Sequence, residues 1–219
     1  MLVRVLEPEV MDSPQEAADY DAMDHSAVNR LFVDDFLAVW RAKGLKGEIL
    51  DLGTGTAQIP IELLRSCPEL SVTAIDLAES MLELARRNVA QAGLSQQIRL
   101  ERTDAKGLTY PSHHFAAVIS NSIVHHIPEP SDVLDEACRV LRPGGALFVR
   151  DLLRPDTEEQ VGHLVSTYAA GANRHQRDLF EASLRAALSL AEIRGIVARL
   201  EHDASRVRQT SDRHWTWSM

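Results

Sequence analysis

The stretch Glu48-Ile-Leu-Asp-Leu-Gly-Thr-Gly-Thr-Ala-Gln58 decides how the rest of this chain is interpreted. Residues 49–52 form a short, mostly apolar run, which predicts a buried strand. The run ends at Gly53 and Gly55, and apolar residues at helical spacing begin at Ile59. Glycine permits backbone conformations that a Cβ disfavours, and the first turn of a helix presents unpaired N–H groups. The stretch therefore predicts a strand, a tight turn and a helix that cradle a nucleotide-like ligand.

Two residues in this stretch bear on which ligand is held. A dinucleotide fingerprint requires a third glycine, and Gln58 stands at that position. Asp51, just before the glycines, suits a cationic ligand better than a pyrophosphate. The run Leu-Asp-Leu-Gly-Thr-Gly-Thr resembles the first motif of class I S-adenosylmethionine-dependent methyltransferases. In that family the glycine loop wraps the amino-acid end of the cofactor, so the resemblance implies a cofactor-binding role for Asp51, Gly53, Thr54 and Gly55.

Size and charge narrow the class of protein further. The chain has 219 residues, 45% of them hydrophobic, which is enough for one full core and predicts a single domain. A net charge of −9 argues against an electrostatic grip on nucleic acid, although Arg174, Arg177 and Arg185 leave room for a local basic patch. No apolar run approaches the roughly 20 residues of a membrane span, and the N-terminus is too acidic for a signal peptide. We expect a cytoplasmic protein without membrane contact.

Periodicity predicts the order of helices and strands. Helices are expected over 14–24 and 26–43, further strands over 71–76, 98–103, 115–121 and 146–151, and a terminal hairpin over 204–217. The resemblance then implies an α/β, Rossmann-like, doubly wound seven-strand sheet, mostly parallel with an antiparallel last strand and with helices on both faces. We expect a helical cap over 1–45, a cofactor-binding core over 46–151, a polar lid over 152–180, and a helix and β-hairpin over 181–219.

The second predicted strand ends in Asp76, which is placed to accept hydrogen bonds from both hydroxyls of a ribose. Nicotinamide-dependent enzymes and methyltransferases share this feature, so it indicates a nucleoside without choosing between them. The alternative for Asp76 is a simple helix cap. Leu77 follows and could pack on the adenine, and Met81 at the start of the next helix completes this side of the expected cofactor site.

The third and fourth predicted strands end in further polar residues. Asp104-Ala105 follows the third strand, and in the resembling family an acid here accepts the adenine amine; a turn residue is the alternative. The fourth strand stops at Asn121-Ser122, at the strand ends where ligands collect in doubly wound sheets. The resemblance implies that Asn121 and Ser122 face the methionine portion of the cofactor.

Two adjacent histidines follow Asn121 and Ser122 in the chain. His125 or His126 could deprotonate an acceptor, because the pKa of imidazole lies near neutral pH. The alternative is a structural or pocket-lining role. No metal site is expected, on the grounds that adjacent histidines in a strand or helix point in different directions and that no carboxylate cluster sits beside them.

The acceptor pocket is predicted only from the resemblance. In that family N-terminal helices lie over the cofactor, which makes Tyr20, Met23 and Asn29 candidate acceptor-binding residues. Packing or surface positions are the alternative for all three.

A second specific match is Leu141-Arg-Pro-Gly-Gly145, a helix end that is frequent in class I methyltransferases before a strand. The ordered set of motifs predicts an enzyme that moves a methyl group from S-adenosylmethionine to a small-molecule acceptor by in-line displacement and leaves S-adenosylhomocysteine. A tRNA or protein methyltransferase, an NAD(P)-dependent oxidoreductase and a non-catalytic cofactor-binding module remain as alternatives. The sequence leaves the acceptor and the oligomeric state open.

Overall fold

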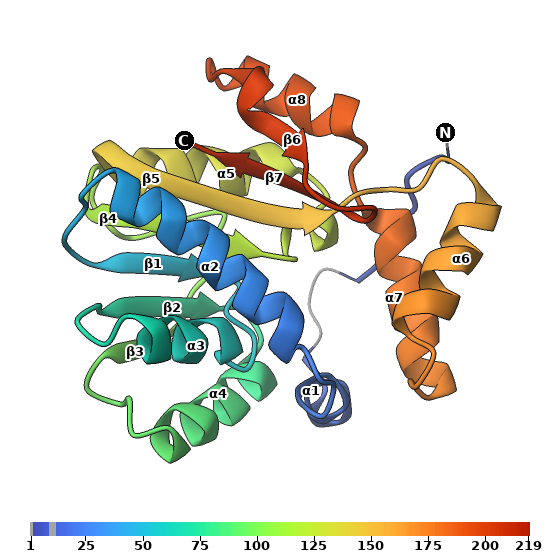
Figure 1. The fold of residues 1–219 in the computed structure, drawn as a ribbon, viewed down its shortest axis with the longest axis horizontal. Coiled ribbons are helices and arrows are strands. Elements are labelled where there is room, and N and C mark those ends of the chain that lie inside the picture. The colour runs from blue at the N-terminus through green and yellow to red at the C-terminus, as the bar shows by residue number, and fades with distance from the viewer. Residues whose placement is uncertain (1, 9–11) are drawn as a thin grey trace. The chain divides into compact units, whose positions relative to one another are not determined.

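The computed structural model describes residues 2–8 and 12–219. It has an α/β fold with one mixed β-sheet (Figure 1). Within the described residues the sheet has seven strands in the order β3-β2-β1-β4-β5-β7-β6. The strands are β1 Ile49–Leu52, β2 Val72–Asp76, β3 Ile98–Arg102, β4 Phe115–Asn121, β5 Leu141–Leu152, β6 Val207–Gln209 and β7 His214–Ser218. The predicted fold class is confirmed, including its seven strands and antiparallel last strand.

The pairing of the strands fixes where a ligand can be held. Strand β1 pairs in parallel with β2 on one side and with β4 on the other, while β2 pairs in parallel with β3. Strand order reverses between β1 and β4, which is the position where doubly wound sheets bind ligands. Leu147 and Met219 exchange both backbone hydrogen bonds, at 3.0 and 3.1 Å, as facing residues of antiparallel chains do.

The helices agree with the predicted positions over most of the chain. Those in the order of the sequence are α1 Pro14–Asp21, α2 Ser26–Ala42, α3 Gln58–Ser66, α4 Glu79–Gln91, α5 Pro130–Val140, α6 Glu158–Tyr168, α7 Arg174–Ala186 and α8 Leu190–Arg199, with short 3₁₀ turns at Val124–His126 and Ala204–Arg206. Ser189 caps α8 through a capping box, as its sequence position indicates. None of these helices is long and apolar enough to cross a membrane.

The segment expected as a polar lid contains two helices, since α6 and α7 occupy most of it, and its role as a lid remains a prediction. Thr157 accepts a hydrogen bond from the backbone of Gln160 and begins α6, and Asn173 begins α7 with a capping box. The buried residues of α6 are Val161 and Leu164, three residues apart. That short apolar stripe was hidden by the many charged residues around it.

The packing of the chain separates two compact units, each made of several segments. The first, here called the sheet unit, comprises residues 10–121, 132–149 and 218–219; the second, the C-terminal unit, comprises 1–9, 122–131 and 150–217. The expected single domain with its four segments remains a prediction.

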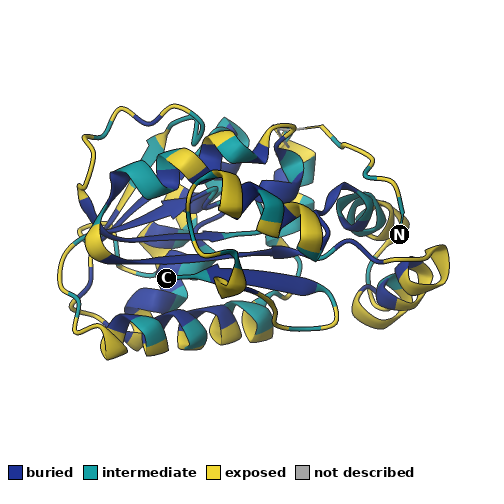
Figure 2. Ribbon diagram, turned by 90° about the horizontal axis from the view of Figure 1, so that it is seen from above, coloured by how far each residue is buried: buried dark blue, intermediate teal, exposed yellow. Residues whose placement is uncertain are grey.

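Each unit has its own apolar core, drawn dark blue in Figure 2. In the sheet unit the rings of Phe32 and Phe36 on α2 lie 5.1 and 6.1 Å from the ring of Phe148 on β5. In the C-terminal unit Trp215 and Trp217 are fully buried. Alternating residues of one strand share a face, so both indoles project to the same side of β7.

Candidate functional site

The glycine loop between β1 and α3 has the left-handed backbone that its sequence predicts. Gly53 and Gly55 have φ values of 68° and 54°. A residue with a Cβ pays about 1–2 kcal/mol in this conformation, which explains the two glycines. The N–H of Thr54 donates to the carbonyl oxygen of Ile75 at 2.9 Å, which fixes the loop against the end of β2.

A polar pocket opens where the loop meets β1 and β4, and every residue of its lining belongs to the sheet unit. The lining residues are Tyr20, Asn29, Asp51, Gly53, Thr54, Thr56, Gln58, Ile59 and Asn121. Six of these were predicted from the sequence: Asp51, Gly53, Thr54 and Asn121 as cofactor residues, and Tyr20 and Asn29 as acceptor residues. Thr56, Gln58 and Ile59 were missed, although their position at the start of α3 was the available signal.

Four buried oxygen atoms of this lining have no hydrogen-bond partner among the described residues. They are Asp51 Oδ2, Thr54 Oγ1, Thr56 Oγ1 and Asn121 Oδ1. A buried polar atom without a partner costs free energy, and most folded proteins avoid it. Two of the atoms accept only, and two are hydroxyls that both donate and accept. The set therefore matches a ligand that carries a cationic donor next to an anionic acceptor.

The electrostatic environment of Asp51 also favours a cationic ligand. Its side chain is 2% exposed. Burial raises the pKa of Asp51 from 3.8 to about 7; the nearby Thr54 hydroxyl opposes this shift and the negative charge of Asp76 adds to it. A bound cation would offset both the burial and the charge of Asp76 and favour the ionised carboxylate.

Asp76 closes the other side of the loop. Its Oδ2 accepts the N–H of Gly55 at 2.8 Å, and its Oδ1 accepts the N–H of Ala78 at 2.9 Å, at the start of α4. Helix α4 has no side-chain cap hydrogen bond, so these contacts hold Asp76 at the loop without capping the helix, and its ribose role remains a prediction. Met81 is 6% exposed and packs with Ala17 of α1, so its buried position serves the contact between these helices.

The residues expected at the adenine lie outside the pocket lining. Asp104 Oδ1 accepts the N–H of Lys106 at 2.9 Å and lies 3.0 Å from its ammonium nitrogen. This geometry fits the turn alternative, and the adenine contacts of Leu77, Asp104 and Ala105 remain predictions. Ser122 has a left-handed φ of 61° and donates its N–H to Arg150 O at 2.9 Å; its cofactor contact is also untested.

The predicted acceptor residues separate into two groups. Tyr20 lines the polar pocket, Met23 lines another depression of the sheet unit with His25 and Arg65, and Asn29 lines both. The ring of Tyr20 lies against the ring of His25, with centroids 4.8 Å apart and planes tilted by 32°. Burial, with help from the charge of Asp76, raises the pKa of Tyr20 to about 12, so this phenol stays protonated. Asn29 donates to the side chain of Gln58 at 3.3 Å.

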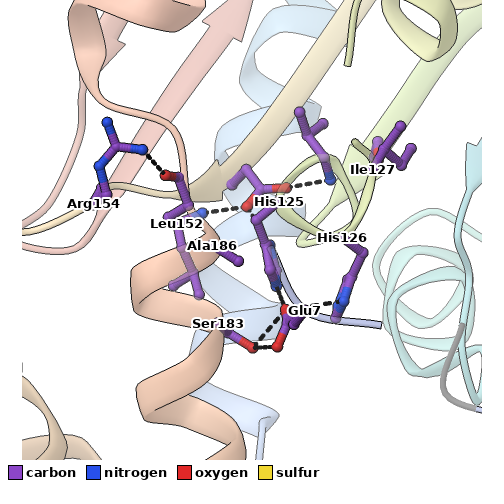
Figure 3. Close-up of polar contacts among 12 residues, drawn as sticks. Glu7, His125, His126, Ile127, Leu152, Arg154, Ser183 and Ala186 are labelled. Carbon is purple, nitrogen blue, oxygen red and sulfur yellow. Dashed lines mark hydrogen bonds and ion pairs between the residues drawn. The ribbon is translucent and has the colours of Figure 1, made fainter. Parts of the chain in front are cut away.

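In the C-terminal unit, His125 and His126 meet two carboxylates. His125 Nδ1 lies 2.6 Å from Asp151 Oδ1 and its Nε2 lies 3.5 Å from Glu7 Oε1, while His126 Nδ1 lies 3.0 Å from the same Glu7 atom (Figure 3). Both grounds given for expecting no metal here are wrong. Tertiary contacts bring distant carboxylates to the histidines, and both rings approach one carboxylate atom.

The charges of this cluster are strongly coupled. Burial opposes protonation of His125, but Asp151 and Glu7 outweigh it and raise the pKa of His125 above its ordinary value. Burial acts against ionisation of Asp151, yet His125 keeps the pKa of Asp151 below its usual range. The structure thus assigns His125 a buried, carboxylate-bound position, and a role as catalytic base for either histidine remains a prediction.

Comparisons with known proteins agree with this geometry. Residues 49–145 match a family model described as a methyltransferase domain. A ubiquinone/menaquinone biosynthesis C-methyltransferase from Desulfotalea psychrophila is 36% identical over 109 residues, which are 50% of this chain and 43% of that protein. The chain spans about half the length of the curated relatives it matches.

Solved structures extend the similarity of fold to nearly the whole chain. A SAM-dependent methyltransferase from Aquifex aeolicus has a TM-score of 0.66 at 20% identity, covering 94% of this chain and 97% of that one. The plantazolicin methyltransferase BpumL, in complex with SAH, has a TM-score of 0.72 at 14% identity, covering 94% and 90%.

Proposed function

We propose that this chain, which belongs through residues 49–145 to the class I S-adenosylmethionine-dependent methyltransferases, moves a methyl group from S-adenosylmethionine to a small-molecule acceptor. The observation that carries the proposal is the set of four unpartnered oxygen atoms at the glycine loop. The amino-acid end of S-adenosylmethionine carries an ammonium and a carboxylate side by side. This pair of charges supplies the donors and acceptors that the pocket lacks.

Each residue of the pocket has a distinct part in holding the cofactor. Asp51 Oδ2 and Asn121 Oδ1 accept hydrogen bonds from the ammonium, and the hydroxyls of Thr54 and Thr56 donate to the carboxylate. Asp76 receives the ribose hydroxyls once the loop N–H of Gly55 yields its place. The partly buried Tyr20 side chain is part of the lining and excludes water from that side of the pocket.

The bound cofactor supplies a methyl group already activated by its sulfonium charge. The chain therefore contributes alignment and exclusion of water rather than bond activation. Asp51 fixes the orientation of the cofactor, because a buried carboxylate is a poor partner for anything but a cation. This role requires the ionised form of Asp51.

A small-molecule acceptor is favoured over a macromolecule by the surroundings of Arg174, Arg177 and Arg185, the three arginines that could have formed a basic patch. Arg185 pairs with Glu158 and Glu181, at 2.6 and 2.7 Å. Arg177 donates to backbone carbonyl oxygens at the end of α6 and beyond, and Arg174 lies 3.8 Å from Asp178. Arg177 and Arg185 are engaged within the chain, and Arg174 stands largely exposed, so these arginines do not form one concentrated basic face. The solved neighbour BpumL is named for its action on plantazolicin.

Calorimetric titration of the purified chain with S-adenosylhomocysteine, and separately with NAD, tests the proposal. We expect saturable binding of S-adenosylhomocysteine and no heat from NAD. Binding of NAD alone would support the oxidoreductase alternative. If S-adenosylhomocysteine binds but methyl transfer to a panel of O, N, C and S nucleophiles is never seen, the non-catalytic module is the better description.

The ribose assignment gives a separate prediction. We expect Asp76→Ala to weaken binding of S-adenosylhomocysteine by about 1–3 kcal/mol, the scale for leaving buried polar partners unpaired. Asp203→Ala, which changes an exposed carboxylate of the C-terminal unit, is the matched control and should leave the affinity unchanged. Equal affinities for wild type and Asp76→Ala would leave Asp76 only its contacts at the loop.

A further inference from the structure

A cluster of metal-ligating side chains lies in the C-terminal unit, outside the polar pocket. Glu7, His125 and His126 each offer one ligand atom, and these atoms all lie within 4.8 Å of one another. Glu7 comes from the N-terminal segment and the histidines from the 3₁₀ turn after β4. Their side chains are 9%, 3% and 19% exposed, so the ligand atoms are held away from bulk water.

We propose that Glu7, His125 and His126 bind a divalent first-row transition-metal ion, with zinc as the reference ion. The ligand set, two imidazole nitrogens and one carboxylate oxygen, suits zinc, iron, cobalt or nickel and disfavours magnesium and calcium, which prefer oxygen alone. Three protein ligands leave a further coordination position open to water.

The distances fit such an ion. Zinc bonds to nitrogen and oxygen ligands are about 2.0–2.2 Å, so two ligands of a tetrahedral ion lie roughly 3.3–3.5 Å apart. Glu7 Oε1 lies 3.0 Å from His126 Nδ1 and 3.5 Å from His125 Nε2. All three ligand atoms lie within 4.8 Å of one another, so small shifts of the two rings and of the Glu7 carboxylate would bring them to bonding distance of one ion.

The surroundings prepare the histidines for this role. His125 Nδ1 is hydrogen-bonded to Asp151 at 2.6 Å, which leaves Nε2 as the free ring nitrogen facing Glu7. A carboxylate behind a histidine ligand is the usual outer-shell arrangement in zinc proteins. His126 Nδ1 is buried and makes no hydrogen bond among the described residues, despite its closeness to Glu7. Figure 3 shows both rings beside the Glu7 carboxylate.

Charge balance is compatible with a dication. Glu7 and Asp151 supply two negative charges, and Ser183 Oγ donates to Glu7 at 3.2 and 3.3 Å, which holds the carboxylate in place. Arg4 is the opposing cation of the same segment. Its guanidinium donates to the carbonyl oxygens of His125 and Ile127, at 3.2 and 3.0 Å, and thus leaves Glu7 unpaired by arginine.

The consequence is a clamp that ties residues 2–8 to the turn at 124–126. An ion that binds the folded chain and not the unfolded chain stabilises the fold in proportion to its concentration over its dissociation constant. The proposal is independent of methyl transfer, because it is read out without S-adenosylmethionine.

The test is a titration of the chelator-treated, full-length chain with Zn²⁺ by calorimetry, together with thermal unfolding with and without Zn²⁺. We expect saturable binding at one ion per chain and a higher unfolding temperature with the ion. Glu7→Gln and His126→Ala should each lose more affinity than the about 10–100-fold that removal of an outer-shell partner costs, and Asp151→Asn should lose about that amount. His175→Ala, which removes an exposed histidine of α7, is the matched control and should bind like the wild type.

Three results would overturn the proposal: no saturable binding to wild type, equal affinity in wild type and His126→Ala, or loss of binding with His175→Ala. Circular dichroism first establishes that each variant is folded. If a variant is unfolded, imidazole ¹⁵N NMR of the wild type decides instead. Zn²⁺ must then shift the resonances of His125 and His126 selectively, and unchanged resonances would leave only an ion pair with Glu7.

Discussion

Asp51→Asn is expected to make the unliganded protein more stable at pH 8 while weakening its binding of S-adenosylhomocysteine about 100-fold. The carboxylate of Asp51 is buried, and its pKa in the folded chain is about 7 instead of the ordinary 3.8. The unfolded chain therefore gives up this proton at a lower pH than the folded chain. Between these two pKa values the free energy of unfolding falls as the pH rises. Above about pH 7 the ionised, buried carboxylate of Asp51 destabilises the fold to its full extent.

An asparagine avoids this cost because it does not ionise. The expected gain at pH 8 is up to about 4 kcal/mol, from a shift of about three pKa units, and it shrinks as the pH approaches 4. Urea unfolding at pH 5 and pH 8 measures it, with the exposed Asp203→Asn as the matched control. A variant that is no more stable than wild type at pH 8 would contradict the burial of a charge at this position.

The same substitution removes the partner of the ligand ammonium. Loss of one member of a buried charge pair costs about 3 kcal/mol, which is the expected 100-fold. Wild-type affinity should rise between pH 6 and pH 8 as Asp51 ionises, whereas the Asp51→Asn affinity should stay flat over this range. Parallel pH profiles for the two proteins would mean that another group controls the binding.

Gly145→Ala is expected to destabilise the protein by about 3 kcal/mol, at the upper end of the range for overpacking. A Cβ at this position would lie 2.7 Å from Leu141 Cδ1, 2.8 Å from Ala116 O and 2.9 Å from Arg142 O. Ala116 is part of β4, so its carbonyl oxygen has little freedom to move. The close approach of backbone to backbone explains the glycine better than a turn preference does.

Gly162→Ala is the matched control, because this glycine lies within α6 and its Cβ would meet nothing within 4 Å. Alanine favours a helix over glycine, so the control should stabilise the protein by about 0.4–1 kcal/mol. Urea unfolding of both variants gives the comparison. If both substitutions destabilise by similar amounts, the contacts around Gly145 are not the cause.

Much of the candidate cofactor site could be predicted because its signals are local. The loop from Asp51 to Gly55 requires glycines and an acid at fixed spacing, and a strand followed by a helix positions them without help from distant residues. Asn121 was found for a related reason. Parallel strands end at one edge of a sheet, so the residue after a buried run is placed by topology.

Other residues near the site were not recognised in the sequence. Thr56 and Gln58 line the pocket only because α3 starts where it does, and Met81 turns out to pack under α1. The local sequence pattern also gave only a weak signal for helices α6 and α7. Their caps at Thr157 and Asn173 are short polar signals, and these were overshadowed by charged residues nearby.

The sequence by itself determined the order of the strands, the glycine loop and the resemblance of residues 49–145 to methyltransferases, because each depends on residues close together in the chain. Only the tertiary structure decided what surrounds His125, since Glu7 and Asp151 come from segments far from it in sequence. It also decided which oxygen atoms at the loop remain without partners. Burial and pairing are properties of the assembled fold, because water competes for every polar group until distant segments exclude it.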